Sequence, residues 1–214
     1  MFKLNKGRHY GPLRRCFEDD TRSWREKKDA AVWRGGLGGS DKRGDDGEFI
    51  QRAALIRRME EGYWTNESLV DVAVVQSEGD HAQWLSKAQI MAYKMIISVE
   101  GNDVASGLKW ALLSTSAVIM PPPTLNSWAL ESSLVPWVHY IPVRQNMSNL
   151  AEMARWCLQN LDACEAIGMQ GRCFAKDWLH EEEEDRIQAS VLARVTTLLE
   201  NDNSTCGQCE RGCP

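Results

Sequence analysis

Residues 94–120, KMIISVEGNDVASGLKWALLSTSAVIM, decide the fold of this chain. Residues 95–99 are a short apolar run rich in β-branched side chains, which predicts a buried strand. Gly101 follows this run and permits a sharp turn. Apolar residues then recur at helical spacing, so residues 103–113 are predicted to form a helix, and residues 117–120 a second buried strand. The order strand, turn, helix, strand predicts one unit of an α/β fold.

The same alternation recurs along the rest of the chain. The predicted strands are residues 30–34, 69–75, 95–99, 117–120 and 138–143. The predicted helices outside the central unit are residues 48–61, 82–93, 150–159 and 161–178 (interrupted near Gly168 and Gly171), with a further helix around Trp128 and Glu131. A last predicted helix starts with the carboxylate run 181–184 and finishes with residues 187–199. Strands that alternate with helices predict an α/β fold with a doubly wound, mostly parallel sheet flanked by helices.

The turn after residue 99 is a candidate anion site. A helix that begins directly after a strand and a glycine directs free backbone N–H groups toward the carboxyl edge of the sheet. Asn102 is predicted to cap this helix, and Ser106 and Lys109 would add a hydroxyl group and a cation near the same end. The geometry is typical of a phosphate site. It also occurs in α/β proteins that bind no ligand there, and a single glycine turn does not separate the two interpretations.

A second glycine-rich turn follows the predicted strand 30–34. Arg34 and Gly35 end this strand, and residues 35–47 form a loop rich in Gly, Asp and Lys. Such a loop can hold a phosphate group, with Arg34 and Arg43 making charge-assisted hydrogen bonds to it. It can equally be a surface connection without a ligand. Because ligands of parallel sheets lie outside the carboxyl ends of the strands, both turns are expected at one edge.

Three long stretches carry a resemblance to a known family. They are YKMIISVEGNDVASGLKWALLSTS (93–116), SAVIMPPPTLNSWALESSLVPWVHYIPV (116–143) and NMSNLAEMARWCLQN (146–160). Together they resemble the C-terminal half of glycosyltransferase family 90, over a region from about Trp33 to Phe174. That family includes protein O-glucosyl- and O-xylosyltransferases of the secretory pathway and microbial sugar transferases that modify lipopolysaccharide or capsule. The run EGNDVASGLKW resembles the microbial branch of the family more closely than the animal enzymes.

The resemblance implies the C-terminal, Rossmann-like domain of a two-domain GT-B glycosyltransferase. It implies a nucleotide-sugar donor, most often a UDP-sugar, a glycan or protein acceptor, and inversion at the anomeric carbon. Trp33-Arg34-Gly35 is similar to the W-R-G part of a donor-side motif that continues to a later Arg. The loop departs from the usual spacing, so both Arg43 and Arg52 remain candidates for that later Arg.

The expected donor-binding residues combine the two turns with this resemblance. They are Arg34, Gly35, Arg43, Glu100, Gly101, Asn102, Ser106 and Lys109, with Glu100 expected to accept hydrogen bonds from ribose hydroxyl groups. No catalytic residue is assigned. In the family the general base is an Asp in the N-terminal domain, well before the W-R-G motif. Only 32 residues precede Trp33, so we expect a fragment, a truncated gene model or a degenerate relative, and leave open whether this chain is an enzyme.

Composition narrows the partners. The net charge of −5 gives no reason to expect nucleic-acid binding, and no run of ~20 apolar residues predicts a membrane-spanning segment. No DxD-like metal pair stands out in a suitable loop, because Asp19-Asp20 and Asp45-Asp46 lie in polar stretches. We therefore predict no metal and no other cofactor. Three of the seven cysteines lie in the last residues, CGQCERGCP, without the fourth ligand of a zinc site. The N-terminus lacks the apolar region of a signal peptide, while the family resemblance is compatible with an endomembrane lumen or, for microbial relatives, the cytoplasm.

The predicted organisation has three parts. Residues 1–29 form a polar N-terminal segment, residues 30–200 the nucleotide-sugar-binding domain, and residues 201–214 a cysteine-containing tail. Two alternatives to a transferase stay open. One is a catalytically inactive module that keeps the fold and binds a nucleotide sugar or a partner. The other is a nucleotide-binding α/β domain with a different reaction.

Overall fold

The computed structural model describes residues 13–15, 18, 20–65, 68–75 and 83–209, except for the side chains of residues 181, 184 and 202–209. The chain divides into two compact units, Met1–Asp177 and Trp178–Pro214. The first unit contains the sheet and the candidate site. The second contains one long helix.

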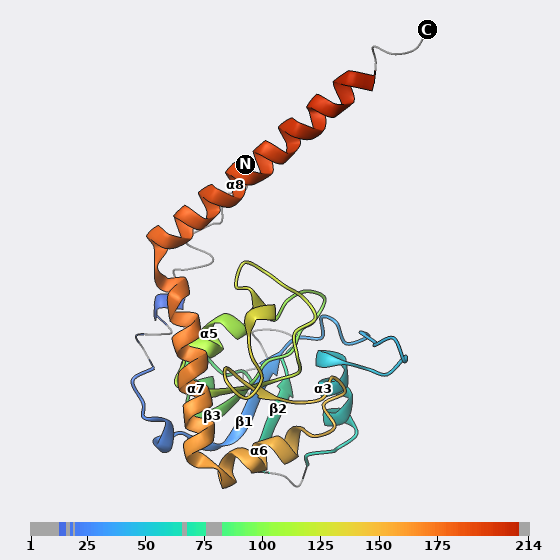
Figure 1. The fold of residues 1–214 in the computed structure, drawn as a ribbon. Helices are drawn as coiled ribbons and strands as arrows, with labels where there is room; N and C mark the ends of the chain where they lie inside the picture. The colour runs from blue at the N-terminus through green and yellow to red at the C-terminus, as the bar shows by residue number, and fades with distance from the viewer. Residues whose placement is uncertain (1–12, 16–17, 19, 66–67, 76–82, 210–214) are drawn as a thin grey trace. The chain divides into compact units, whose positions relative to one another are not determined.

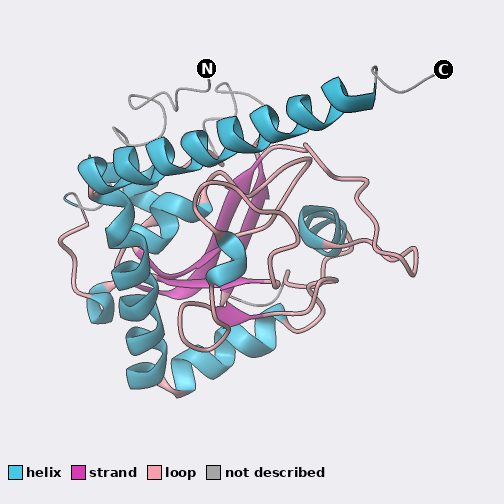
Figure 2. Ribbon diagram, turned by 45° about the horizontal axis from the view of Figure 1, so that its top comes forward, coloured by secondary structure: helices cyan, strands magenta, loops and turns pink. Residues whose placement is uncertain are grey.

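The sheet is all parallel and has five strands. They are β1 (Lys28–Gly35), β2 (Val70–Val74), β3 (Tyr93–Ile97), β4 (Ala117–Met120) and β5 (Ile141–Pro142). Their order is β2-β1-β3-β4-β5, and each neighbouring pair is parallel. Figure 2 shows this sheet, in magenta, between helices. The predicted α/β fold with a parallel sheet flanked by helices is therefore confirmed.

The helices of the first unit cover both faces of this sheet. They are α3 (Gln51–Glu60), α4 (Lys87–Ile90), α5 (Leu108–Leu113), α6 (Leu150–Gln159) and α7 (Leu161–Lys176). Two short 3-10 helices, η1 (Trp24–Glu26) and η2 (Glu131–Ser133), belong to the same unit, and a third, η3 (Asp177–Leu179), begins at its last residue. Helix α3 packs beside β2, α6 contacts β1 and β4, and α5 and α7 pack on each other and on β4 (Figure 1).

Alternation along the strands divides the core into two layers. On one face, Ala31, Met95 and Ile119 join a cluster with Leu55 of α3 and Leu150 of α6. On the other face, α4 contacts β3 and α5 contacts β4. Successive residues of a strand point to opposite faces. Strands buried on both faces explain why they appear in the sequence as continuous apolar runs.

The helix predicted for residues 103–113 begins later than expected, at Leu108. Gly107 is its N-cap, and no side chain makes a capping hydrogen bond. Asn102 is exposed in the preceding loop, where Gly101 N–H donates to the Asp103 carbonyl at 3.1 Å. This local turn uses the backbone groups that a longer helix would need, so the predicted capping by Asn102 is wrong. The helix also has only six residues, and its dipole offers little to an anion.

Two other predicted elements are shorter in the structure. The helix predicted for residues 82–93 is reduced to α4, because Tyr93 already begins β3; residue 82 lies outside the described residues. The strand predicted for residues 138–143 begins only at Ile141, since a turn precedes it. In this turn His139 N–H donates to the Val135 carbonyl at 2.9 Å. The helix expected around Trp128 and Glu131 is only η2.

Helix α7 runs without the interruption predicted near its two glycines. A Cβ atom on Gly168 would lie 3.1 Å from Ala117 N, and one on Gly171 would lie 2.5 Å from the His139 carbonyl oxygen. Both glycines therefore serve close packing of the helix on the sheet side rather than a break in it. Periodicity alone does not distinguish these two roles.

A disulfide that the sequence analysis did not predict joins α6 to α7. It links Cys157 and Cys164, seven residues apart, and both are fully buried in the apolar cluster. Cys173 is a free, exposed cysteine. The side chains of the cysteine cluster at residues 206–213 lie outside the described part of the chain.

The second unit contains α8 (Glu181–Cys209). The sequence predicted that the helix ends at residue 199 and a tail follows, but helix continues through Cys209. Large apolar side chains along it are exposed: Ile187, Val191, Leu192, Val195, Leu198 and Leu199. Within the described residues, no helix combines the length and hydrophobicity that crossing a membrane requires.

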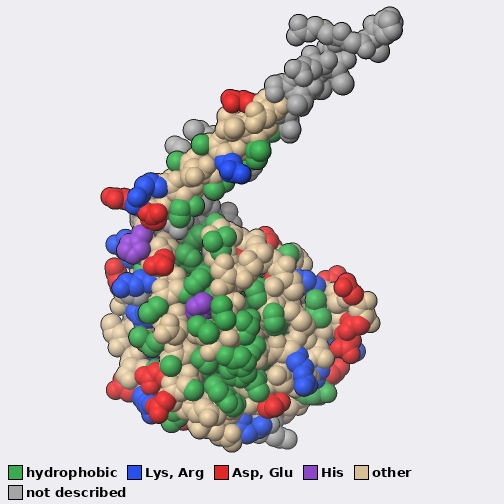
Figure 3. Space-filling view, viewed as in Figure 1, with side chains coloured by type: hydrophobic (Ala, Val, Ile, Leu, Met, Phe, Trp, Pro, Cys, Tyr) green, Lys and Arg blue, Asp and Glu red, His purple; other side chains and the backbone are tan. Residues whose placement is uncertain are grey.

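Hydrophobic side chains also gather in the middle of one face of the first unit (Figure 3). Large exposed ones in this unit include Leu130, Val135, Trp137 and Val138, which lie close together in the sequence. Leu130 and Trp137 have positive φ angles of 53° and 64°, which are uncommon for residues with a side chain. The segment therefore holds apolar side chains outward at some cost in backbone energy.

Candidate donor pocket

A pocket of about 350 Å³ lies at the carboxyl ends of β1 and β3. The chain leaves β1 toward β2 on one side and leaves β3 toward β4 on the other, so these two strands form the switch point of the sheet. Ligands of open parallel sheets bind in the crevice at such a point. The position is thus the one that the fold itself provides for a ligand. We call it the donor pocket.

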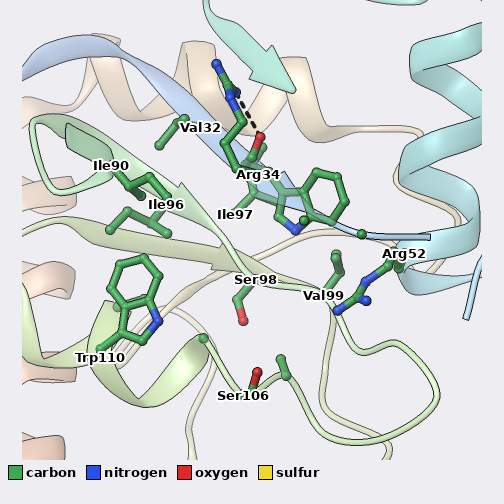
Figure 4. A pocket seen from close by; sticks show the side chains of 16 residues that line it. Val32, Arg34, Arg52, Ile90, Ile96, Ile97, Ser98, Val99, Ser106 and Trp110 are labelled. Atoms are coloured by element: carbon green, nitrogen blue, oxygen red, sulfur yellow. Dashed lines mark hydrogen bonds between the residues drawn. The ribbon is translucent and has the colours of Figure 1, made fainter. Parts of the chain in front are cut away.

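The donor pocket has an apolar part and a polar part. Val32, Ile90, Ile96 and the half-buried Trp110 line one end. Arg52, Ser98 and Ser106 line the other, with the backbone of Gly35 and Gly36. Figure 4 shows the Trp110 ring on one side of the pocket and Arg52 entering from α3 on the opposite side. A ligand with one flat apolar end and one polar or charged end matches this division.

Arg52 carries an uncompensated charge at the polar end. Its Nη1 donates to the Gly38 carbonyl at 2.9 Å, while its buried Nε has no hydrogen-bond partner. Among the residues that the structure describes, no carboxylate forms an ion pair with it. Burial lowers the pKa of Arg52, and no opposing charge offsets that effect. The guanidinium group lies 5.9 Å from the centroid of the Trp33 ring, which does not neutralise it. A half-buried cation without a counter-ion is costly, so the pocket is electrostatically prepared for an anion.

The backbone before Arg52 is strained in a way that positions this side chain. Gln51, which begins α3, has a positive φ of 55° and is 1% exposed. Its Oε1 accepts from Glu100 N–H at 3.3 Å, and Arg52 N–H donates to the Glu100 carbonyl at 3.3 Å. The start of α3 is therefore tied to the turn after β3. Strain of this kind persists where neighbouring structure enforces it, often at functional sites.

Gly101 lets two loops approach each other beside Arg52. A Cβ atom on Gly101 would lie 2.6 Å from the Gly38 carbonyl oxygen and 2.8 Å from Arg52 Nη1. On the opposite loop, Gly39 has a φ of +80°, and a Cβ atom there would lie 2.5 Å from the Gly101 carbonyl carbon. Only glycine fits at both positions. The glycine-rich loop after β1 and the turn after β3 therefore meet, as expected for two turns at one edge of the sheet.

Glu100 holds the surrounding loops together. Its Oε1 accepts from the backbone N–H groups of Thr124 and Leu125 at 2.7 and 3.0 Å, and its Oε2 accepts from Lys42 Nζ at 3.1 Å. The side chain is 6% exposed. The structure thus gives this carboxylate a set of protein partners, and it lies outside the lining of the donor pocket.

Arg34 lines the donor pocket but its guanidinium group turns toward β2, away from Ser98 and Ser106 (Figure 4). It forms an ion pair with Asp71 at 2.6 Å and donates to the backbone oxygens of Trp33 and Asp71, each at 2.9 Å. The Tyr93 hydroxyl donates to the same Asp71 carboxylate at 2.6 Å. Burial, reinforced by this carboxylate, raises the pKa of Tyr93 to about 12. Arg34 is thus anchored in a network between three strands.

Besides Glu100, two further expected donor-binding residues, Lys109 and Arg43, lie outside the lining of the donor pocket. Lys109 forms a buried ion pair with Glu131 at 3.2 Å and lies over the Trp128 ring. Burial raises the pKa of Glu131, but hydrogen bonds from Ser127 and the charge of Lys109 outweigh it and leave the pKa lowered. Arg43 stacks on Phe49 at 3.7 Å and lines a different cleft.

The structure therefore brings together part of the expected set. Arg34, Gly35 and Ser106 line the donor pocket, Gly101 supports its Arg52, and Asn102 is exposed in the loop beside them. Of the two candidates for the later Arg, only Arg52 enters the donor pocket. The sequence analysis did not single out Trp110, Ser98 or Gln51. Trp110 follows Lys109 in the central stretch, but a Trp in a predicted helix is typical of a core residue as well.

Comparison with protein families identifies the family of the chain. The model of glycosyl transferase family 90 matches residues 13–203. The chain belongs to this family. The family model covers the sheet, the donor pocket and most of α8, so the resemblance seen in the central stretches extends over nearly the whole chain.

Individual relatives of this family 90 chain come from bacteria, animals and viruses. It is 28% identical over 204 residues to O-glucosyltransferase LpsA of Dichelobacter nodosus, covering 94% of this chain and 58% of that protein. It is 28% identical over 163 residues to protein O-glucosyltransferase 2 of Danio rerio, covering 73% of this chain and 30% of that protein. An uncharacterized protein, 035R of invertebrate iridescent virus 3, is 35% identical over 121 residues, covering 54% of this chain and 11% of that protein. The chain thus spans less than two thirds of these relatives.

Proposed function

We propose that this chain binds a nucleotide sugar, a UDP-sugar, in the donor pocket. The whole protein would transfer the sugar to a hydroxyl group of a glycan or protein acceptor with inversion. The observation that carries the proposal is Arg52, a half-buried cation without a carboxylate partner among the described residues, at the switch point of the sheet. Membership in a glycosyltransferase family supports glycosyl transfer as the reaction.

The division of the pocket supports one orientation of the donor. The pyrophosphate would lie at Arg52, whose guanidinium group would donate charge-assisted hydrogen bonds to it. Such bonds are stronger than hydrogen bonds between neutral groups. The nucleoside would lie toward Trp110 and Ile90, which offer a flat aromatic face and an aliphatic wall. Ser98 and Ser106 would supply hydroxyl groups between the two ends. The volume of about 350 Å³ is at the lower end of the range of roughly 300–1,000 Å³ for small-molecule sites.

The chemistry would be a single displacement at the anomeric carbon. The acceptor oxygen forms a bond to this carbon, the bond to the pyrophosphate oxygen breaks, and the acceptor proton passes to a general base. The nucleoside diphosphate leaves with the electron pair and gains negative charge. A fixed cation stabilises that charge most in a site that excludes water. Because Arg52 is half-buried, its guanidinium group would stabilise the leaving group more than a fully exposed cation would.

The names of the relatives indicate which sugar to test first. Several are O-glucosyltransferases, from a bacterium and from animals. UDP-glucose is therefore the first donor in the proposal, with UDP-xylose and UDP-galactose as comparisons. No metal ion is part of the proposal. Titration with UDP-glucose in EDTA and in Mn²⁺ tests this point, and an affinity that depends on Mn²⁺ would contradict it.

One observation favours a second candidate, a donor-binding module without catalysis of its own. Among the described residues that line the donor pocket, none has a carboxylate or imidazole group. Asp20 and Asp29 pair with lysines at the amino ends of the strands, and Asp19 lies outside the described residues. We therefore expect the 214-residue chain alone to bind the donor weakly and transfer nothing.

Calorimetric titration tests the binding proposal. UDP and UDP-glucose are expected to bind more tightly than ATP or NAD. Arg52→Gln is expected to weaken UDP binding at least about tenfold, since a hydrogen bond to a charged group contributes about 1.5–3 kcal/mol. Arg186→Gln, an exposed arginine on α8, is the matched control. Equal affinity of Arg52→Gln and wild type for UDP would exclude the proposed site.

A transfer assay separates the two candidates. Radiolabelled UDP-glucose is incubated with the chain and with mixed glycan and protein acceptors. Turnover by the chain alone, abolished in Asp20→Asn or Asp29→Asn with the fold intact by circular dichroism, would show that the base lies in its first residues and would exclude the non-catalytic module.

A further inference from the structure

A second cleft lies on α3, separate from the donor pocket. It has a volume of about 330 Å³ and shares no lining residue with the donor pocket. Its lining combines three arginines, two glutamates, two aromatic rings, an alanine and an asparagine: Arg43, Glu48, Phe49, Ala54, Arg57, Arg58, Glu61, Tyr63 and Asn146. We call it the arginine cleft. Nothing in the proposed donor chemistry uses it.

Aromatic rings fix the guanidinium groups of the arginine cleft. Phe49 is contacted by Arg43, at 3.7 Å from the ring centroid, and by Arg57, at 4.8 Å. Arg58 lies 4.5 Å from the centroid of Tyr63, a ring that is itself 58% exposed. Stacking and cation–π contacts of this kind hold planar guanidinium groups in place before a ligand arrives.

The hydrogen bonds leave part of this charge available. Arg57 is neutralised by Glu61 at 3.0 Å. Arg43 donates from Nη1 to the Gly47 carbonyl at 2.6 Å, and Arg58 donates from Nε to the Asn146 carbonyl at 2.6 Å. Within the described part of the chain, neither of these two arginines forms an ion pair.

The remaining carboxylate does not cancel this charge. Glu48 accepts a hydrogen bond from Asn146 Nδ2 at 3.1 Å. Three arginines against two glutamates leave one net positive charge in the cleft. The two arginines without an ion pair bond to backbone carbonyls through one nitrogen each, which leaves further N–H groups to donate to an oxyanion.

We propose that the arginine cleft binds an acidic saccharide. Arg43 and Arg58 would hold an oxyanion, a phosphate or a carboxylate, and the exposed Tyr63 ring would lie against the sugar. Arginine side chains recognise both oxyanions through paired N–H donors, and an aromatic face offers an apolar surface to a sugar ring. The assignment of this saccharide to the acceptor rests on the proposed function. The binding of an acidic saccharide in the arginine cleft does not depend on that function.

The test is calorimetric titration of the full chain at low salt with two acidic probes and their neutral counterparts. Glucose 6-phosphate is compared with glucose, and trigalacturonate with galactotriose. At least one acidic probe is expected to bind ten or more times tighter than its neutral counterpart, and the two pairs show whether phosphate or carboxylate is preferred. The double variant Arg43→Gln/Arg58→Gln is expected to bind that acidic probe at least tenfold more weakly than the wild type does. The control variant Arg186→Gln is expected to bind it like the wild type.

UDP titration of the same variants separates this proposal from the donor site. Arg58→Gln, which leaves every expected donor-binding residue in place, is expected to bind UDP like the wild type, and circular dichroism shows whether the double variant folds. Loss of UDP binding in Arg43→Gln alone, with the fold intact by circular dichroism, would place Arg43 at the donor and overturn the proposal. Equal binding of acidic and neutral probes, no binding of either acidic probe, or an unchanged affinity in the double variant would overturn it as well. A wild-type chain that fails to bind UDP but binds an acidic probe would contradict the donor site alone.

Discussion

The two ends of the sheet treat buried cations differently. At the amino ends of the strands, Lys27 is fully buried and bonds to the Asp20 carboxylate at 2.8 Å and to Ser116 Oγ at 2.9 Å. At the carboxyl ends, Arg52 is half-buried, and within the described residues its guanidinium group makes one hydrogen bond, to the Gly38 carbonyl. Burial lowers the pKa of both residues, but only for Lys27 does a carboxylate oppose the effect.

The amino end therefore carries a charge that stabilises the fold, whereas the carboxyl end carries a charge that an anion would stabilise. A buried charge that has its full set of partners stabilises one conformation and offers nothing to a ligand. A buried charge without a counter-ion destabilises the free protein and gains most when an anion arrives. The predictions below follow from this contrast between the Lys27 network and the Arg52 site.

The largest expected effect is the loss of the Lys27 partner. Asp20→Ala leaves a fully buried ammonium group without its carboxylate, and the Asp20 side chain also accepts from Thr115 N–H at 2.6 Å. Breaking a buried pair in this way costs about 3–5 kcal/mol, measured as the free energy of unfolding in urea. Asp162→Ala, whose carboxylate is 96% exposed and pairs with the exposed Arg25, is the control and is expected to cost far less. A loss below about 1 kcal/mol for Asp20→Ala would remove the contrast.

The second prediction concerns the turn that positions Arg52. Gly101→Val would place side-chain atoms against the Gly38 carbonyl and the Arg52 guanidinium group, both within 3 Å of the new Cβ. We expect UDP affinity to fall more than for Arg52→Gln, because the loop and the arginine both move. Titration with UDP and a thermal melt measure the two effects. Wild-type melting temperature together with wild-type UDP affinity would show that the close approach is unimportant.

The third prediction compares stability with binding at one residue. Arg52→Gln is expected to lower UDP affinity at least about tenfold. Its free energy of unfolding is expected to stay equal or rise, because an unpaired, half-buried charge is removed. Urea denaturation and UDP titration of the same sample test both halves. A protein that loses stability and affinity together would resemble the Lys27 network and would contradict a site prepared for an anion.

The sequence predicted the fold well because periodicity reports burial. Continuous apolar runs predicted β3 and β4 and the parallel sheet correctly. The predicted start of α5 was wrong because the hydrogen bonds of the loop around Asp103 compete with a longer helix. The periodicity of apolar residues gives no information on these hydrogen bonds. The α6–α7 disulfide was not predicted, since pairing of Cys157 with Cys164 depends on how the two helices meet.

The candidate site was only partly predictable for a related reason. Position at a strand end correctly identified Arg34 and Gly35 as residues of the pocket lining. It could not show that Lys109 turns to Glu131, or that Arg43 stacks on Phe49, because both depend on partners distant in sequence or on loop geometry. Roles of these residues toward a donor stay predictions. For Lys109→Ala the structure leads us to expect loss of stability, through an unpaired Glu131, as the main effect.

The smallest expected effect is at Ser106, an exposed residue of the pocket lining. Ser106→Ala removes one neutral hydroxyl group and leaves the Arg52 charge in place. A neutral hydrogen bond contributes about 0.5–1.5 kcal/mol, so UDP affinity is expected to fall roughly two- to tenfold, less than in Arg52→Gln. Stability should not change, because the side chain is exposed. Ser133→Ala, an exposed serine on η2 outside the pocket lining, is the matched control for UDP titration. A loss at Ser106 equal to that at Arg52 would mean that charge does not dominate donor binding, and that the contrast between the two ends of the sheet has a different origin.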